Sequence, residues 1–164
     1  MVWREEGEKV GVTVENWGQK DTEESNTGSR MCIIEYSEIP SSLANAHAAD
    51  GKLLFGAGNI CSHYITLDFL VQKVLPSLSE TYHLAPKKIP YYDTTSQTTL
   101  IPSSPNGVKL ELFVFDVFPL SDRWVVVEAD RAEEFAPVKN APGSAVDSPD
   151  TARRLLTLQA ARYV

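Results

Sequence analysis

The chain has little positive charge, few cysteines and no long apolar segment. It holds 15 lysines and arginines against 22 aspartates and glutamates, which gives a formal net charge of −7. Such a surface offers few contacts to a polyanion, so nucleic acids and anionic membranes are not expected partners. No apolar run approaches the ~20 residues of a membrane span, and residues 1–6 lack the hydrophobic segment of a signal peptide. We expect a cytoplasmic protein that binds small molecules or other proteins.

The two cysteines and three histidines do not predict a metal site. Cys32 and Cys61 lie in separate segments, each flanked by apolar residues, so both are expected to be buried thiols. A disulfide between them would not suit a cytoplasmic protein. His47, His63 and His83 lack the spacing of metal ligands, and each is expected in a core or surface role.

Strand-like and helix-like patterns are mixed along the sequence, which indicates an α/β domain. With 164 residues, 43% of them apolar, the chain has the size and core of one domain, residues 1–164. The alternation and apolar runs predict strands at residues 10–15, 30–36, 53–55 and 124–127, the last two buried, and a hairpin at 86–101 with its tip at 94–99. Helices are expected at 40–49, 60–75, where Pro76 ends or bends the helix, 108–119 and 151–163. The polar stretch 16–30 is expected to be a solvated loop insertion.

Residues 105–118 are the stretch that most directly suggests a function. Leu110, Phe113, Val114, Val117 and Phe118 recur at spacings of three and four, which predicts a helix entered through a Pro-Asn-Gly turn. The first turn would carry a lysine at position 109, where helices usually prefer negative charge. A cation there makes sense if an anion binds between it and the helix end.

The lysine at position 139 is a second such cation, between Pro137 and Asn140. The alternative for Lys109 and Lys139 is that both are solvated surface residues.

Four motifs, in order along the chain, carry a resemblance to a known family. They are Ile-Ile-Glu-Tyr-Ser-Glu-Ile at 33–39, Leu-Phe-Gly-Ala-Gly-Asn-Ile at 54–60, Pro-Asn-Gly-Val-Lys to Phe-Val-Phe-Asp-Val-Phe at 105–118, and Phe-Ala-Pro-Val-Lys-Asn at 135–140. From about Val10 to the C-terminus, the chain resembles the C-terminal half of the catalytic domain of eukaryotic UDP-N-acetylglucosamine pyrophosphorylases. The resemblance implies part of a Rossmann-like nucleotidyltransferase domain with a mixed sheet.

The resemblance also implies roles for side chains that otherwise have simpler explanations. Glu35 would accept hydrogen bonds from sugar hydroxyls, although a carboxylate at a strand end can equally be solvated or cap a helix. Asn59 would contact the sugar, although it could cap the helix that follows. Phe113 and Phe115 would shape the pocket for the N-acetyl group, although both could be core aromatics. Phe115 falls outside the main apolar stripe of the expected helix.

By the same resemblance, the two lysines act as catalytic phosphate clamps, Lys109 toward UTP and Lys139 toward the sugar phosphate. The implied reaction joins UTP and an N-acetylhexosamine 1-phosphate and releases pyrophosphate, with Mg²⁺ as cofactor. Fixed cations reduce the repulsion between the two anions, and positioning supplies most of the remaining acceleration.

Two parts of the family's site are missing from this sequence. These are the glycine-rich UTP loop, of the form Gly-Gly-x-Gly-Thr-Arg-Leu-Gly, and the aspartate that holds the metal; the segment 56–58, Gly-Ala-Gly, does not replace the loop. We therefore expect the sugar-binding half of a longer enzyme, inactive by itself and marginally stable. The alternatives are a uridylyltransferase for UDP-sugars or hexose 1-phosphates of other specificity, and a non-catalytic fragment that binds a sugar nucleotide.

Overall fold

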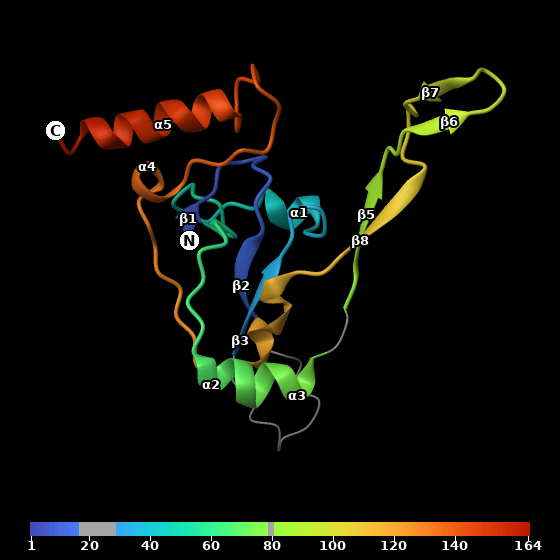
Figure 1. Ribbon diagram of the computed structural model, residues 1–164. Coiled ribbons are helices and arrows are strands. Elements are labelled where there is room, and N and C mark those ends of the chain that lie inside the picture. Colours follow the sequence, from blue (N-terminus) through green and yellow to red (C-terminus); the bar gives the residue numbers. More distant parts are fainter. Residues whose placement is uncertain (17–28, 79–80) are drawn as a thin grey trace. The chain divides into compact units, whose positions relative to one another are not determined.

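The computed structural model describes residues 1–16, 29–78 and 81–164 (Figure 1). The proposed loop insertion at 16–30 lies almost entirely outside the described residues. The described chain forms two compact units, one from Met1–Ile65 with Asp122–Val164 and the other from Thr66–Ser121.

The first unit is built on a four-stranded antiparallel sheet in the order β1-β4-β2-β3 (Figure 1). Its strands are β1 (Val2–Trp3), β2 (Val12–Asn16), β3 (Arg30–Ile34) and β4 (Ala57–Gly58). The strands expected at 10–15 and 30–36 are confirmed, and they pair so that Val12 lies opposite Ile34. Val2 and Val12 are almost fully buried and form the centre of this unit's core.

Two predicted buried strands of the first unit are wrong. Leu53 makes only an isolated bridge to His47, and the ladder forms further along, where Gly58 pairs with both Val2 and Val12. Residues 124–127 belong to no strand, and Val125 is 78% exposed. A short apolar run indicates what could be buried, but the fold decides whether a neighbouring strand covers it.

The helices of the first unit are α1 (Ser41–Ala44), α4 (Arg131–Glu134) and α5 (Pro149–Ala161). The helix expected at 40–49 is confirmed only for its first turn. The helix expected at 151–163 is confirmed as α5, and Ser148 caps it with a hydroxyl that accepts the Thr151 N–H at 3.3 Å. Gln159 of α5 and Arg162, the residue after the helix, donate to Glu133 of α4, each at 2.7 Å, and so fix these two helices together.

The second unit begins with a continuous helical stretch, α2 (Leu67–Phe69), η1 (Leu70–Val74) and α3 (Leu75–Ser77). The helix expected at 60–75 therefore starts seven residues later than predicted. It starts after Thr66, whose hydroxyl accepts the Phe69 N–H at 3.3 Å. The stretch ends one residue after Pro76, as the proline predicted.

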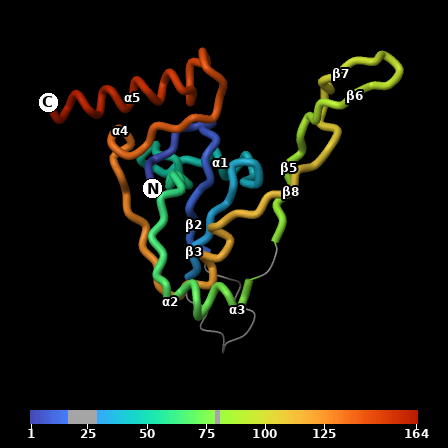
Figure 2. Tube along the Cα trace, viewed as in Figure 1, coloured from blue at the N-terminus to red at the C-terminus, as the bar shows by residue number. Residues whose placement is uncertain are grey.

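The rest of the second unit consists of a two-stranded ribbon, with a hairpin between its strands, and a 3-10 helix that follows it. Strands β5 (His83–Lys87) and β8 (Gly107–Glu111) pair antiparallel, and the chain between them forms the expected hairpin, β6 (Tyr91–Asp93) and β7 (Thr98–Leu100) (Figure 2). The helix η2 (Val114–Leu120) follows β8. The resemblance implied a mixed sheet. Among the described residues, every strand pair is antiparallel, and no parallel pair is present.

The helix predicted at 108–119 is wrong in its first half. Val108, Leu110 and Leu112 alternate with Lys109 and Glu111, and this period of two fits the strand β8. The helical spacing of later residues hid that alternation, because a few apolar positions satisfy both periods. Lys109 consequently lies on a strand rather than at the positive end of a helix.

Candidate functional site

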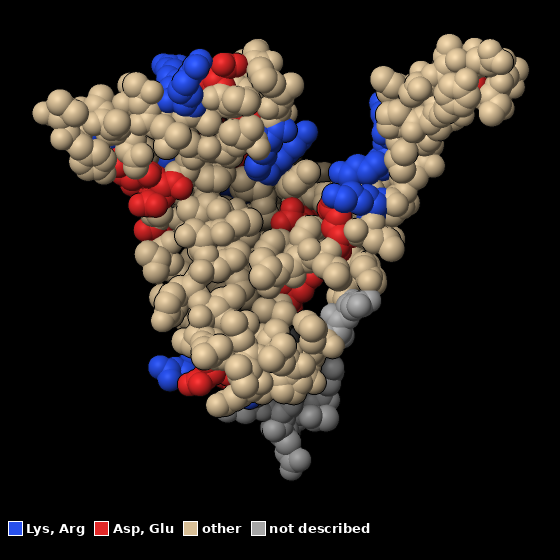
Figure 3. Space-filling view, in the orientation of Figure 1, with Lys and Arg blue, Asp and Glu red and all other residues tan. Residues whose placement is uncertain are grey.

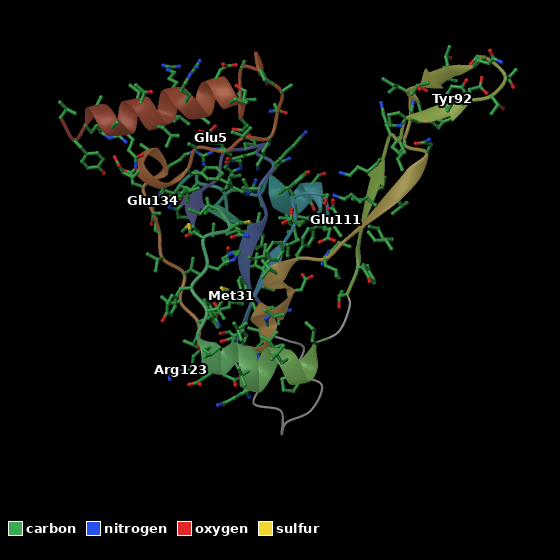
Figure 4. All side chains as sticks on the ribbon, in the orientation of Figure 1. Glu5, Met31, Tyr92, Glu111, Arg123 and Glu134 are labelled. Carbon is green, nitrogen blue, oxygen red and sulfur yellow. The ribbon has the colours of Figure 1, made fainter. Side chains whose placement is uncertain are left out.

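One pocket of the first unit brings together three of the residues singled out in the sequence. Glu35, Asn59 and Lys139 all line it, although they come from three motifs far apart in the chain. Its volume of about 1130 Å³ exceeds that of most pockets for small ligands. The N-terminal segment at 5–11 forms one wall, and Glu5 of that wall is labelled in Figure 4.

Glu35 is placed by the end of β3 and by a glycine on the neighbouring segment. It follows Ile34 directly, and its carbonyl accepts the N–H groups of Glu38 and Ile39 at 2.9 and 3.0 Å, which forms a turn after the strand. A Cβ added at Gly11 would lie 2.8 Å from Oε1 of Glu35. Only a glycine therefore lets this carboxylate approach the entry to β2. We did not single out Gly11 from the sequence, although a glycine next to a strand often marks such a close approach.

Asn59 is fixed through both its backbone and its side chain. Its N–H donates to the Gly11 carbonyl at 2.8 Å, which places Asn59 and Glu35 on either side of the same glycine. Its Oδ1 accepts the Cys61 N–H at 3.0 Å and lies 2.9 Å from Nε2 of His63. The alternative of a helix cap is wrong, because the next helix starts at Leu67.

His63 is half-buried, and its contact with Asn59 defines its tautomer. Because Oδ1 of an amide can only accept, Nε2 of the ring must carry the hydrogen. Burial, and secondarily the positive N-terminus, lowers the pKa of His63 below its usual 6.5. The imidazole is therefore neutral at pH 7 and donates to Asn59.

The segment that carries Lys139 is anchored at Arg131, earlier in the chain, and at Lys139 itself. The Arg131 side chain donates to the Trp3 carbonyl at 3.1 Å and forms an ion pair with Glu8. The Asp147 carbonyl accepts the Lys139 backbone N–H at 2.7 Å. The Lys139 ammonium itself donates to the Lys9 carbonyl. Lys139 thus brings a positive charge to the pocket beside the Lys9 carbonyl.

These groups give the pocket three complementary functions. Glu35 supplies a charged hydrogen-bond acceptor, the Asn59 amide supplies a donor, and Lys139 supplies a positive charge. A polyhydroxylated ligand with one anionic group would use all three. Catalytic chemistry beyond binding and charge neutralisation does not follow from these side chains alone.

The other predicted site residues, Lys109, Phe113 and Phe115, belong to the second unit. Phe113 and Phe115 stack with ring centroids 4.9 Å apart, and the His83 ring lies 4.4 Å from Phe113. Phe115 is 5% exposed, so the residue outside the predicted apolar stripe is in fact buried.

Asp116 ties this aromatic pair to the ribbon of the second unit. Its Oδ2 lies 3.0 Å from Nε2 of His83 and accepts the Phe113 N–H at 3.3 Å. Sequence reasoning assigned no function to either His83 or Asp116.

Lys109 of the second unit forms an ion pair with Glu111 at 2.9 Å, where Figure 3 shows positive and negative side chains together on the ribbon. Hydrogen bonding from Lys109 lowers the pKa of Glu111. The structure thus offers Lys109 a carboxylate partner in place of the helix end that the sequence suggested.

The cysteines and possible metal ligands give a mixed result. Both cysteines are free, as expected, but only Cys32 is partly buried, whereas Cys61 is exposed. Burial raises the pKa of the Cys32 thiol. Across residues 1–16, 29–78 and 81–164, no group of three or more His, Cys, Asp or Glu side chains could hold a metal ion. Within the same ranges, no helix has the length and apolar character needed to cross a membrane.

Comparisons with known proteins agree with the four motifs. No family model matches the chain. UDP-N-acetylglucosamine pyrophosphorylase of Saccharomyces cerevisiae is 47% identical over 129 residues, which cover 76% of this chain and 27% of that protein. UDP-N-acetylglucosamine diphosphorylase 2 of Arabidopsis thaliana is 40% identical over 160 residues, 96% of this chain and 28% of that protein.

A solved structure gives the same result for the fold. The uridine diphosphate N-acetylglucosamine pyrophosphorylase of Trypanosoma brucei, solved with an inhibitor, matches 99% of this chain and 29% of its own with a TM-score of 0.68 and 32% identity. The expected α/β fold class is therefore confirmed. The chain spans about a quarter of the length of the curated relatives it matches. The chain is thus similar to a segment of the UDP-N-acetylglucosamine pyrophosphorylases, as the order of its motifs predicted.

Proposed function

We propose that this chain is the sugar-side half of a uridylyltransferase that joins UTP and N-acetylglucosamine 1-phosphate to form UDP-N-acetylglucosamine and pyrophosphate. The observation that carries the proposal is that Glu35, Asn59 and Lys139 line one pocket together. These residues belong to separate sequence motifs, and their functional groups complement a sugar phosphate.

In the proposed role, each residue of the pocket acts on one part of the sugar phosphate. Glu35 accepts hydrogen bonds from sugar hydroxyls, and Asn59 donates to another sugar oxygen. Lys139 leaves the Lys9 carbonyl and neutralises the phosphate, which lowers its repulsion from the triphosphate. In the second unit, Phe113 and Phe115 shape the N-acetyl pocket and Lys109 acts toward UTP.

Magnesium remains part of the proposal only through the resemblance. The described side chains do not offer a group suited to hold it, so we assign it no ligand in this chain and derive no step through it. The cytoplasmic location likewise stays a prediction.

Calorimetric titration with N-acetylglucosamine 1-phosphate tests the proposal, with glucose 1-phosphate as the matched ligand. We expect binding of the acetylated sugar phosphate and weaker binding of the other. The two ligands differ by an acetamido group in place of a hydroxyl, and burial of the acetamido methyl in an apolar pocket is worth about 1–3 kcal/mol. Equal affinity for both ligands would favour an enzyme of other sugar specificity, and absence of binding would contradict the proposal.

Pyrophosphate release from UTP, N-acetylglucosamine 1-phosphate and Mg²⁺ then separates a half-site from a complete enzyme. We expect no turnover by this chain, because it lacks the glycine-rich loop. Turnover specific to the acetylated sugar would show that a nucleotide site can be built without that loop, and would overturn the half-site interpretation.

A further inference from the structure

We propose that His63 is a positioning residue that holds the Asn59 amide with its NH₂ group available to donate to the ligand. The proposal rests on the proposed function, because it takes Asn59 as a sugar contact. It assigns a role to a histidine for which the sequence pattern indicated only a core or surface position.

The contact with Cys61 favours one of the two orientations of the Asn59 amide. The Cys61 backbone N–H lies 3.0 Å from the side-chain oxygen of Asn59. An N–H group can only donate, so rotating the amide by half a turn would bring two donors together. The contact with Cys61 therefore requires Oδ1 on that side.

His63 adds a second donor to the same oxygen. Its Nε2 lies 2.9 Å from Oδ1 of Asn59, four residues earlier in the chain. With two donors, Oδ1 has both of its lone pairs engaged, and a sugar hydroxyl gains no acceptor there. The remaining polar atom, Nδ2, lies 3.6 Å from Sγ of Cys61, which is a weak acceptor. Asn59 can therefore serve the ligand as a donor, while Glu35 serves as the acceptor.

The neutral state of His63 is compatible with this role. Because burial lowers its pKa, the ring remains neutral at pH 7 and adds no positive charge to compete with Lys139 for the phosphate. Its role is therefore one of hydrogen-bond orientation rather than charge.

The test compares His63→Phe, which keeps a ring but loses the donor, with His63→Gln, which restores an N–H donor. The matched control is His47→Phe, the same change at an exposed histidine that contacts the Asn45 carbonyl and does not line the pocket. For N-acetylglucosamine 1-phosphate, we expect His63→Phe to weaken binding about tenfold, His63→Gln by no more than about threefold, and His47→Phe not at all.

A second readout separates positioning from a general loss of structure. In ¹⁵N-labelled protein, the side-chain NH₂ resonance of Asn59, assigned by its disappearance in Asn59→Ala, should shift when the sugar phosphate is added. His63→Phe leaves the Cys61 donor in place and removes the second donor, so it should reduce this shift but leave the ligand-induced shift of the Lys139 backbone amide.

Three results would overturn the proposal. The first is an Asn59 shift that is unchanged in His63→Phe, and the second is equal loss of binding in His63→Phe and His63→Gln. In either case the proposed function would stand. If neither Asn59 nor Lys139 responds to ligand in the unaltered chain, the proposed function fails, and the proposed role of His63 fails with it.

Discussion

Replacing Gly11 with alanine should weaken sugar-phosphate binding while leaving the fold intact. The added Cβ would lie 2.8 Å from Oε1 of Glu35 and 2.9 Å from Cγ2 of Ile33, and ordinary contact begins at 3.4 Å. Gly11 is not among the glycines with positive φ, so alanine can adopt its backbone conformation. The side chains must move instead, and such overpacking typically costs about 1–3 kcal/mol of unfolding free energy.

The effect on binding follows from the displaced carboxylate. A hydrogen bond to a charged group contributes about 1.5–3 kcal/mol, so losing the contact between Glu35 and a sugar hydroxyl should weaken binding about 10- to 150-fold. Calorimetric titration with N-acetylglucosamine 1-phosphate measures this change, and thermal unfolding monitors the fold.

The double variant Gly11→Ala with Glu35→Asp provides the control. The shorter aspartate makes room for the new methyl group, so the two substitutions should weaken binding by less than the sum of their separate effects. Unchanged affinity in Gly11→Ala, with the fold intact, would refute the placement of Glu35 against Gly11.

Three further changes have defined outcomes. Lys139→Ala should lower affinity for the sugar phosphate, and turnover in a complete enzyme, far more than the melting temperature; equal losses would reassign Lys139 to structure. Because the pKa of His63 is lowered on folding, the unfolded chain binds more protons, and stability should fall as the pH drops below about 6.5. Thermal unfolding of His63→Gln at acid pH should show a weaker dependence of stability on pH. An unaltered pH dependence would show that His63 does not contribute to it. With a thiol-specific reagent, exposed Cys61 should react before Cys32, whose thiol pKa is raised by burial; the reverse order in single-cysteine variants would contradict the structure.

The sequence predicted strands and turns best where one pattern stood alone. The alternation of Val10, Val12 and Val14 gave β2, and the serine and proline at 148–149 begin the helix that was expected from 151. The prediction for residues 107–111 was wrong because the alternating stretch is short and continues into a segment whose apolar residues have helical spacing. The buried strand predicted at 124–127 was wrong because apolar composition does not reveal whether another strand lies alongside.

The site was predictable only in part for a related reason. Motifs selected Glu35, Asn59 and Lys139, and the structure places all three at one pocket. Local patterns could not identify Gly11 and His63, because each matters through a neighbour brought close by folding or by a turn. Gly11 meets a carboxylate from another strand, and His63 meets an amide four residues away without an intervening helix.

The expected marginal stability is also open to measurement. Leu84, Val108 and Leu110 of the ribbon are each more than half exposed, which favours association through this surface. We expect concentration-dependent association in sedimentation experiments. A soluble monomer with a cooperative melt would contradict this expectation.

The most direct test of the account is to map the ligand onto the protein. Two-dimensional NMR spectra of the ¹⁵N-labelled chain, recorded during titration with N-acetylglucosamine 1-phosphate, report which residues it contacts. The account predicts that the largest shifts occur at Gly11, Glu35, Asn59 and Lys139, around the one pocket they line. Shifts concentrated elsewhere in the chain, or a spectrum unchanged at saturating ligand, would contradict it.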